Sequence, residues 1–201
     1  MILTEMPDPS SWAQATAAQL SKTIEDVAAA PAPFHLGEER LDFSKLALQA
    51  GAAIDRLTAD GRIDRDRCIY VISLDSKADA KALKTDFMEA KQRTDLKLPQ
   101  NNIDISTTLY VGSSCATHKR TRTLHSRLRQ HLIAAPNATY ALSLAEWTSH
   151  LQGGLIVNAW QYPSIGTEKK GDNAARRIVL AVENWLAGEL EPMLGRRGSR
   201  H

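Results

Sequence analysis

The chain has 201 residues, of which 43% are hydrophobic, and its formal net charge at pH 7 is +2. This length suits one domain with an appendage, and no apolar run approaches the ~18 residues that a membrane span needs. Two cysteines outside any CxxC pair argue against a disulfide framework and a zinc site, which favours a reducing, cytoplasmic setting. The first ten residues lack the basic and apolar regions of a signal peptide.

The charge is distributed unevenly along the chain. Residues 1–66 contain eleven acids and six bases, whereas residues 105–201 contain twelve bases and six acids. No acid occurs between Asp104 and Glu146, and the bases in that interval are Lys119, Arg120, Arg122, Arg127 and Arg129. Such a stretch is often a solvated helix face, but a local positive field also suits a polyanion such as nucleic acid.

Residues 1–66 are expected to form an N-terminal helical extension. An Ala-rich helix over 11–30 should end before Pro31, because proline cannot continue a helix. A second helix is expected over 43–58, where apolar residues recur at steps of three and four. Nothing in these two helices suggests chemistry.

A different pattern begins at Cys68. Short segments rich in β-branched and aromatic residues predict strands over 68–74, 105–111, 140–147 and 155–162. Amphipathic spacing predicts helices over 76–94, 123–133 and 172–190. The predicted fold class is α/β (α+β), with a small mixed or antiparallel sheet of about three to four strands flanked by helices.

An ordered set of short motifs runs through these elements. Cys68-Ile69-Tyr70 lies on the first predicted strand, and Tyr110-Val111-Gly112 lies on the second, followed by two serines. Arg127 and His131 are four residues apart, which places them on one face of the following helix. Glu183 lies on the last predicted helix.

This ordered set resembles the GIY-YIG nuclease family over residues 67–197. The resemblance implies a nuclease domain over 67–201 and a catalytic set that comprises Tyr70, Tyr110, Arg127, His131 and Glu183, with Glu183 as the metal ligand. The family often has a proline nine residues after this glutamate, and Pro192 occupies that position.

The chain departs from the family pattern at three points. Cys68 replaces the opening glycine. Tyr70 and Tyr110 are forty residues apart, which implies an insertion over about 76–103. Gly195 stands twelve residues after the glutamate, where the family has an asparagine that helps to position the site.

Phosphodiester hydrolysis needs an activated water and a counter-charge for the transition state. Glu183 alone can hold Mg²⁺ or Mn²⁺, because a hard cation keeps most of its coordination sphere for water and phosphate. Arg127 offers a planar fork to phosphate oxygens. The resemblance implies that Tyr70 is the general base toward water and that Tyr110 orients water or phosphate. His131 is an alternative base or relay, because a histidine titrates at ~6.5.

The leading hypothesis is a metal-dependent endonuclease that acts on double-stranded DNA, of restriction or repair type. Further nucleic-acid contacts are expected from Lys119, Arg120, Arg122 and Arg129. One alternative, suggested by Gly195, is a catalytically degenerate GIY-YIG-like module that binds nucleic acid without cutting it. Another is an α/β interaction domain with no nucleic-acid role. No membrane association is expected, and a homo-oligomer is possible but not indicated.

Overall fold

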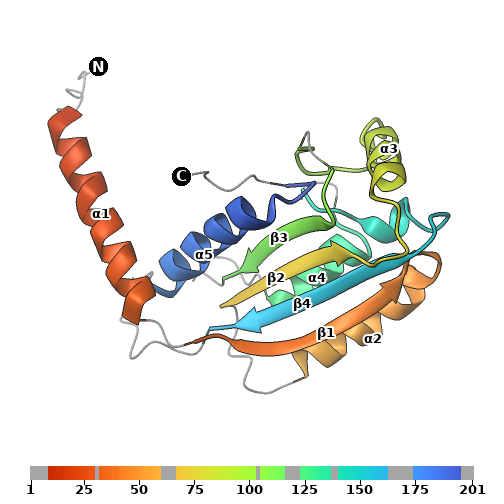
Figure 1. The fold of residues 1–201 in the computed structure, drawn as a ribbon, viewed down its shortest axis with the longest axis horizontal. Coiled ribbons are helices and arrows are strands. Elements are labelled where there is room, and N and C mark those ends of the chain that lie inside the picture. Colours follow the sequence, from red (N-terminus) through yellow and green to blue (C-terminus); the bar gives the residue numbers. More distant parts are fainter. Residues whose placement is uncertain are drawn as a thin grey trace.

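The fold is built on a four-stranded antiparallel sheet with the strand order β1-β4-β2-β3 (Figure 1). The strands are β1 (Phe34–Asp42), β2 (Cys68–Leu74), β3 (Thr108–Ser114) and β4 (Gly154–Gln161). The structure is a computed structural model, and it describes residues 9–29, 32–59, 67–102, 105–115, 123–136, 140–162 and 174–195. The α+β class predicted from the sequence is confirmed.

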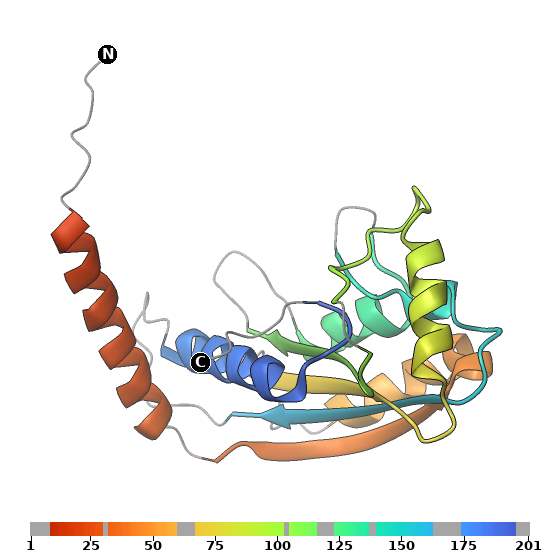
Figure 2. The same ribbon diagram turned by 45° about the horizontal axis from the view of Figure 1, so that its top comes forward.

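Helices cover both faces of the sheet. Helices α2 (Leu46–Thr58) and α4 (Leu124–Leu132) pack on one face, and α5 (Ala174–Leu190) packs on the other (Figure 2). Successive strand residues point to opposite faces. On β2, Tyr70 therefore joins the large core with α2 and α4, whereas Val71 meets α5.

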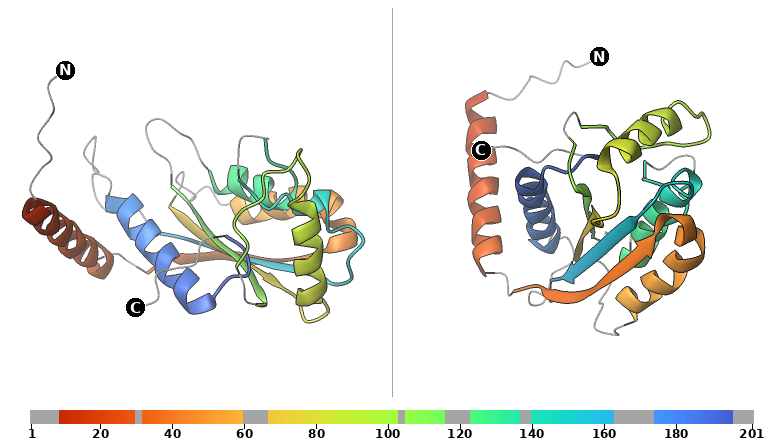
Figure 3. Two further views of the ribbon diagram at one scale, coloured as in Figure 1. Left: turned by 90° about the horizontal axis from the view of Figure 1, so that it is seen from above. Right: turned by 45° about the vertical axis from the view of Figure 1, so that its right-hand side comes forward.

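The predicted helical extension over 1–66 divides into two structurally different parts. Helix α1 (Pro9–Ala29) matches the expected helix, and it projects from the rest of the molecule with its C-terminal part beside α5 (Figure 3). The expected second helix over 43–58 is present as the 3₁₀ turn η1 (Phe43–Lys45) and helix α2, whereas residues 34–42 form the unexpected strand β1. The buried Leu41 and Ile54 join the core. The sheet therefore includes residues that the sequence placed outside the predicted domain.

The predicted strand over 140–147 was wrong. This segment contains a short 3₁₀ turn, η2 (Leu144–Glu146), and Ser143 has a left-handed φ of 45° that no strand residue adopts. Leu142, Leu144 and Trp147 are nevertheless buried. The alternation of apolar residues therefore reflects a loop that packs into the core rather than a sheet ladder.

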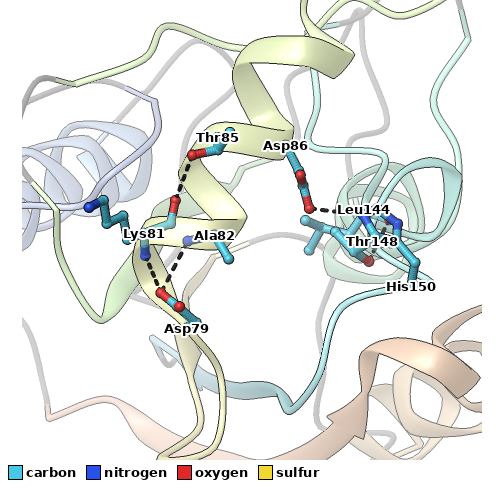
Figure 4. Close-up of polar contacts among 8 residues, drawn as sticks. All are labelled: Asp79, Lys81, Ala82, Thr85, Asp86, Leu144, Thr148 and His150. Carbon is cyan, nitrogen blue, oxygen red and sulfur yellow. Dashed lines mark hydrogen bonds and ion pairs between the residues drawn. The ribbon is translucent and has the colours of Figure 1, made fainter.

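The insertion contains one helix, α3 (Ala80–Ala90), which is shorter than the predicted 76–94. Asp79 begins the helix, because its side chain accepts hydrogen bonds from the backbone N–H groups of Lys81 and Ala82 (Figure 4). Asp86 then contacts His150, with 3.0 Å between Oδ2 and Nε2. These contacts fix α3 in place and tie it to the loop before β4.

Several basic side chains of the insertion donate hydrogen bonds to nearby backbone carbonyls. Lys84 donates to the carbonyl of Asn102 at 2.9 Å, and Lys91 donates to that of Pro99 at 3.2 Å. Arg93 donates to the carbonyl of Glu146 at 3.1 Å. These cations therefore stabilise the inserted segment. Among the described residues, no helix is both long and apolar enough to cross a membrane.

Candidate active site

The candidate site lies at the β3 edge of the sheet. A cavity of about 470 Å³ opens there, lined by Tyr110, Val111, Ser113, Arg127, Arg176, Leu180, Glu183, Asn184 and Ala187. Arg127 comes from α4 on one face of the sheet, and Glu183 comes from α5 on the other. These helices can share a cavity because β3 is an outer strand, so their side chains meet around its edge.

Three aromatic rings cluster at this cavity, where Tyr110 lines the wall and Tyr70 and His131 lie behind it. The ring centroids of Tyr70 and Tyr110 are 6.3 Å apart, and that of His131 lies 4.4 Å from Tyr110 and 5.7 Å from Tyr70. Tyr70 pairs with Gly112 across the β2–β3 ladder. A Cβ at Gly112 would be 2.5 Å from the Tyr70 hydroxyl, so the absence of a side chain at this position lets the rings gather.

The two tyrosines differ in their surroundings. Tyr110 is half-buried and lines the cavity, whereas Tyr70 is fully buried. The Tyr70 hydroxyl makes no hydrogen bond of normal geometry to the described residues. Burial raises the pKa of Tyr70, and the nearby charge of Arg127 opposes this shift only in part. At neutral pH Tyr70 is therefore a protonated phenol and a potential hydrogen-bond donor.

His131 is a buried, neutral histidine. Burial and the charge of Arg127 hold its pKa well below 6.5. Its Nδ1 accepts the backbone N–H of Leu142 at 3.2 Å, so we assign the ring proton to Nε2. In this tautomer His131 is a hydrogen-bond donor at Nε2, which argues against the predicted role of a base.

Arg127 and His131 present two donors to each other. Arg127 Nη2 lies 3.2 Å from Nε2 of His131, and Arg127 Nη1 donates to Gln130 Oε1 at 2.8 Å. A neutral imidazole has one acceptor nitrogen, which the backbone of Leu142 already uses. An oxygen acceptor between the guanidinium and the ring would satisfy both groups, and a phosphate oxygen has this chemistry.

Glu183 is held by the strand that it faces. The Ser113 hydroxyl on β3 donates a hydrogen bond to Glu183 Oε2. Its neighbours Leu180 and Trp185 are 43% and 57% exposed, so Glu183 does not lie among core residues. Glu183 instead faces a polar cavity, where its carboxylate is accessible to a metal ion.

The donors around Glu183 fit a hydrated hard cation. Glu183 and Ser113 supply oxygen atoms, which Mg²⁺ and Mn²⁺ prefer. Within the described ranges, no three His, Cys, Asp or Glu residues gather to hold a metal ion. A hard cation here would take one protein carboxylate, that of Glu183, and complete its shell with water and phosphate.

The segment with Gly195 packs against Tyr110 and the start of β3. Met193 and Leu194 donate backbone hydrogen bonds to Thr108 and Leu109 at the start of β3, and Gly195 packs on the Tyr110 ring. The buried Asn102 holds this segment, because its side-chain amide donates to the carbonyl of Pro192 at 2.6 Å. Asn102 comes from the insertion, so spacing within the C-terminal motif could not have found it.

Of the four further residues predicted to contact nucleic acid, the structure describes Arg129. Arg129 is exposed on α4 and does not line the cavity. Lys119, Arg120 and Arg122 lie outside the described residues. The sequence did not single out Arg176, although its spacing of seven residues from Glu183 on a predicted helix is a signal for one shared face.

Comparison with protein-family models, with curated proteins and with solved structures finds no match to this chain.

Proposed function

We propose that this chain is a metal-dependent endonuclease that hydrolyses phosphodiester bonds in DNA. The observation that carries the proposal is the convergence of four elements on one cavity. Tyr70 on β2, Tyr110 on β3, Arg127 and His131 on α4, and Glu183 on α5 are all at or directly behind it. This arrangement supports the resemblance to the GIY-YIG nucleases, and a restriction or repair role is part of the proposal.

Glu183 would hold Mg²⁺ or Mn²⁺, and the Ser113 hydroxyl orients its carboxylate. A bound cation supplies positive charge against the negative charge that develops on the phosphate oxygens. Arg127 donates to non-bridging oxygens of the same phosphate from the other wall of the cavity. The substrate phosphate thus lies between α4 and α5.

The donors behind Arg127 complete this phosphate pocket. The Nε2 proton of His131 needs an acceptor, because Arg127 offers it only another donor. The buried Tyr70 hydroxyl also makes no hydrogen bond of normal geometry to the described residues. We assign both groups to hydrogen bonds that strengthen as negative charge grows on the phosphate.

Tyr110 fits the role of general base better than Tyr70 does. Tyr110 lines the cavity, where water has access, whereas Tyr70 is fully buried and its pKa is raised. In this proposal Tyr110 first loses its phenolic proton to solvent, and as a phenolate it takes the proton of the attacking water. Tyr70 stabilises the phosphate as a donor.

The test is cleavage of supercoiled plasmid by the full-length protein with Mg²⁺ or Mn²⁺. We expect nicked and linear products from the wild type, and a loss of more than about a hundredfold in rate in Glu183→Gln. Glu189→Gln is the matched control, because Glu189 is exposed on the same helix and does not line the cavity. Equal rates in Glu183→Gln and the wild type would contradict the proposal.

A second candidate is the degenerate module that binds nucleic acid without cutting it. The observation that favours it is Gly195, which has no amide in place of the family's asparagine. This module would bind duplex DNA more weakly as salt increases, and it would not cut DNA with either cation. Glu183→Gln would then keep or increase its affinity for DNA, because it removes a negative charge.

A further inference from the structure

The cavity carries a second guanidinium that the proposed reaction does not use. Arg176 lines it from α5, seven residues before Glu183 and therefore about two helical turns away. Leu180, Asn184 and Ala187 line the same cavity, and their spacing places them on the same face of the helix. Arg176 and the proposed metal ligand Glu183 thus lie on one face of α5, and this face lines the cavity.

Arg176 and Arg127 differ in the contacts that their side chains make within the described part of the chain. Arg127 is half-buried, donates to Gln130 and lies against His131, so its position is fixed. Arg176 is exposed, and its side chain forms no hydrogen bond or ion pair within the described part of the chain. Arg176 is therefore available to a ligand that reaches beyond the phosphate at Arg127.

The charges that line the cavity favour more than one phosphate. The lining contains two guanidinium groups and the single carboxylate of Glu183, and its other side chains are neutral. The balance is already positive before Glu183 holds a cation. A cavity of this kind attracts a polyanion more strongly than a single phosphate.

We propose that Arg176 binds a second phosphate of the cleaved strand, so that the cavity takes an oligonucleotide rather than an isolated nucleotide. This inference rests on the proposed function and specifies its substrate. Seven residues of helix advance about 10 Å, whereas a DNA strand advances about 3.4 Å per nucleotide. With the reach of an arginine side chain, the second phosphate lies about one to three nucleotides from the reacting one.

The first test measures binding without cleavage. The full-length Glu183→Gln protein is titrated with a labelled DNA duplex, without divalent cations, between about 50 and about 200 mM salt. Adding Arg176→Ala should make the slope of log Kd against log salt shallower by about 0.9, the value for one lost phosphate contact. Arg176→Lys should keep the slope, because it keeps the charge.

Arg40→Ala is the charge-matched control for this titration. Arg40 lies on β1 at the opposite edge of the sheet, and it pairs with Glu38 at 2.8 Å. The slope should not change in this variant. Equal slopes in Arg176→Ala and Arg40→Ala would overturn the proposal for Arg176 while leaving the nuclease proposal intact.

The second test locates the phosphate on a short duplex whose cleavage position has been mapped. Neutral methylphosphonate linkages replace the flanking phosphates one at a time. The wild type should lose cleavage efficiency at one flanking position, and Arg176→Ala should be insensitive at that position only. An equal loss in both proteins at every position would refute the inference. A wild type that cleaves neither plasmid nor duplex would instead contradict the proposed function.

Discussion

The ring of Tyr110 lies directly against Gly195, so that a Cβ built on Gly195 would be 2.6 Å from Cε2 of Tyr110. Gly195 also has a φ of +93°, a conformation that L side chains rarely adopt. The glycine therefore does not leave a gap where the family has an asparagine. It allows the backbone to support the ring of a proposed catalytic tyrosine.

Gly195→Ala should lower the free energy of unfolding by about 1–3 kcal/mol, because the new side chain is strained and displaces Tyr110. Cleavage should fall as well. Thermal or denaturant unfolding and plasmid cleavage would measure the two effects. Gly51→Ala is the control, because no atom lies within 4 Å of a Cβ at this helical position. That variant should be as stable as the wild type or more stable.

Tyr70→Phe should separate stability from activity. The hydroxyl of Tyr70 is buried and makes no hydrogen bond of normal geometry to the described residues, so its removal should leave the free energy of unfolding unchanged or raise it by about 1 kcal/mol. Cleavage should nevertheless fall by about a hundredfold if the hydroxyl donates to the phosphate. Tyr140→Phe, at an exposed position, should change neither quantity. Full activity in Tyr70→Phe would remove Tyr70 from the proposed machinery.

Ser113→Ala should raise the Mg²⁺ concentration that cleavage requires without destabilising the fold. Without the Ser113 hydroxyl, the Glu183 carboxylate loses the hydrogen bond that orients it. The Mg²⁺ concentration for half-maximal cleavage should rise about tenfold, an effect typical of a partner that orients a metal ligand. Cation titrations of cleavage and calorimetric Mn²⁺ binding would measure it. Ser149→Ala, at an exposed position, is the control. An unchanged titration would mean that Ser113 does not orient the ligand.

His131 should make the protein less stable in acid. Its pKa is lowered in the folded state, whereas in the unfolded chain it titrates at ~6.5. Below that pH the unfolded state binds the extra proton, so stability is fully present above ~6.5 and is lost as the pH falls toward the lowered pKa. The loss approaches about 1.4 kcal/mol per pH unit in this range. Denaturant unfolding between about pH 5 and about pH 7.5 would measure it.

His131→Gln is the comparison for this pH series, because glutamine keeps a polar side chain that does not titrate. It should lower stability at neutral pH but flatten the dependence below ~6.5. His150→Gln is the matched control, since His150 is exposed and paired with Asp86. An equally steep loss in wild type and His131→Gln would show that another group is responsible.

The sequence predicted those elements in which the regularly spaced apolar residues are also the buried ones. The spacing of Leu124, Leu128 and Leu132 predicted α4, and all three leucines are buried. Strand β1 was missed, because Glu38, Glu39 and Arg40 have little strand preference. It is a strand because its backbone pairs with β4. Glu38 and Arg40 are exposed to solvent, whereas Glu39 accepts hydrogen bonds from Arg56 on α2. Backbone pairing of this kind leaves no pattern in side-chain hydrophobicity.

The candidate site was predictable in its members but not in their roles. Ordered motifs selected Tyr70, Tyr110 and Glu183, and the structure brings all three to one edge of the sheet. Burial separates the roles of the two tyrosines, and burial depends on the helices that pack over them. The tautomer of His131 depends on the backbone of Leu142, eleven residues away in a loop that looked like a strand.

The strand order also sets the sequence in which the protein can assemble on the ribosome. Strands β2 and β3 can form a hairpin as soon as β3 has been synthesised. Strand β1 is synthesised first, but its partner β4 follows more than a hundred residues later, so this pairing has a high loop-closure cost. The nascent chain therefore carries an unpaired edge until Gln161 has emerged, and formation of the β1–β4 ladder should limit the folding rate.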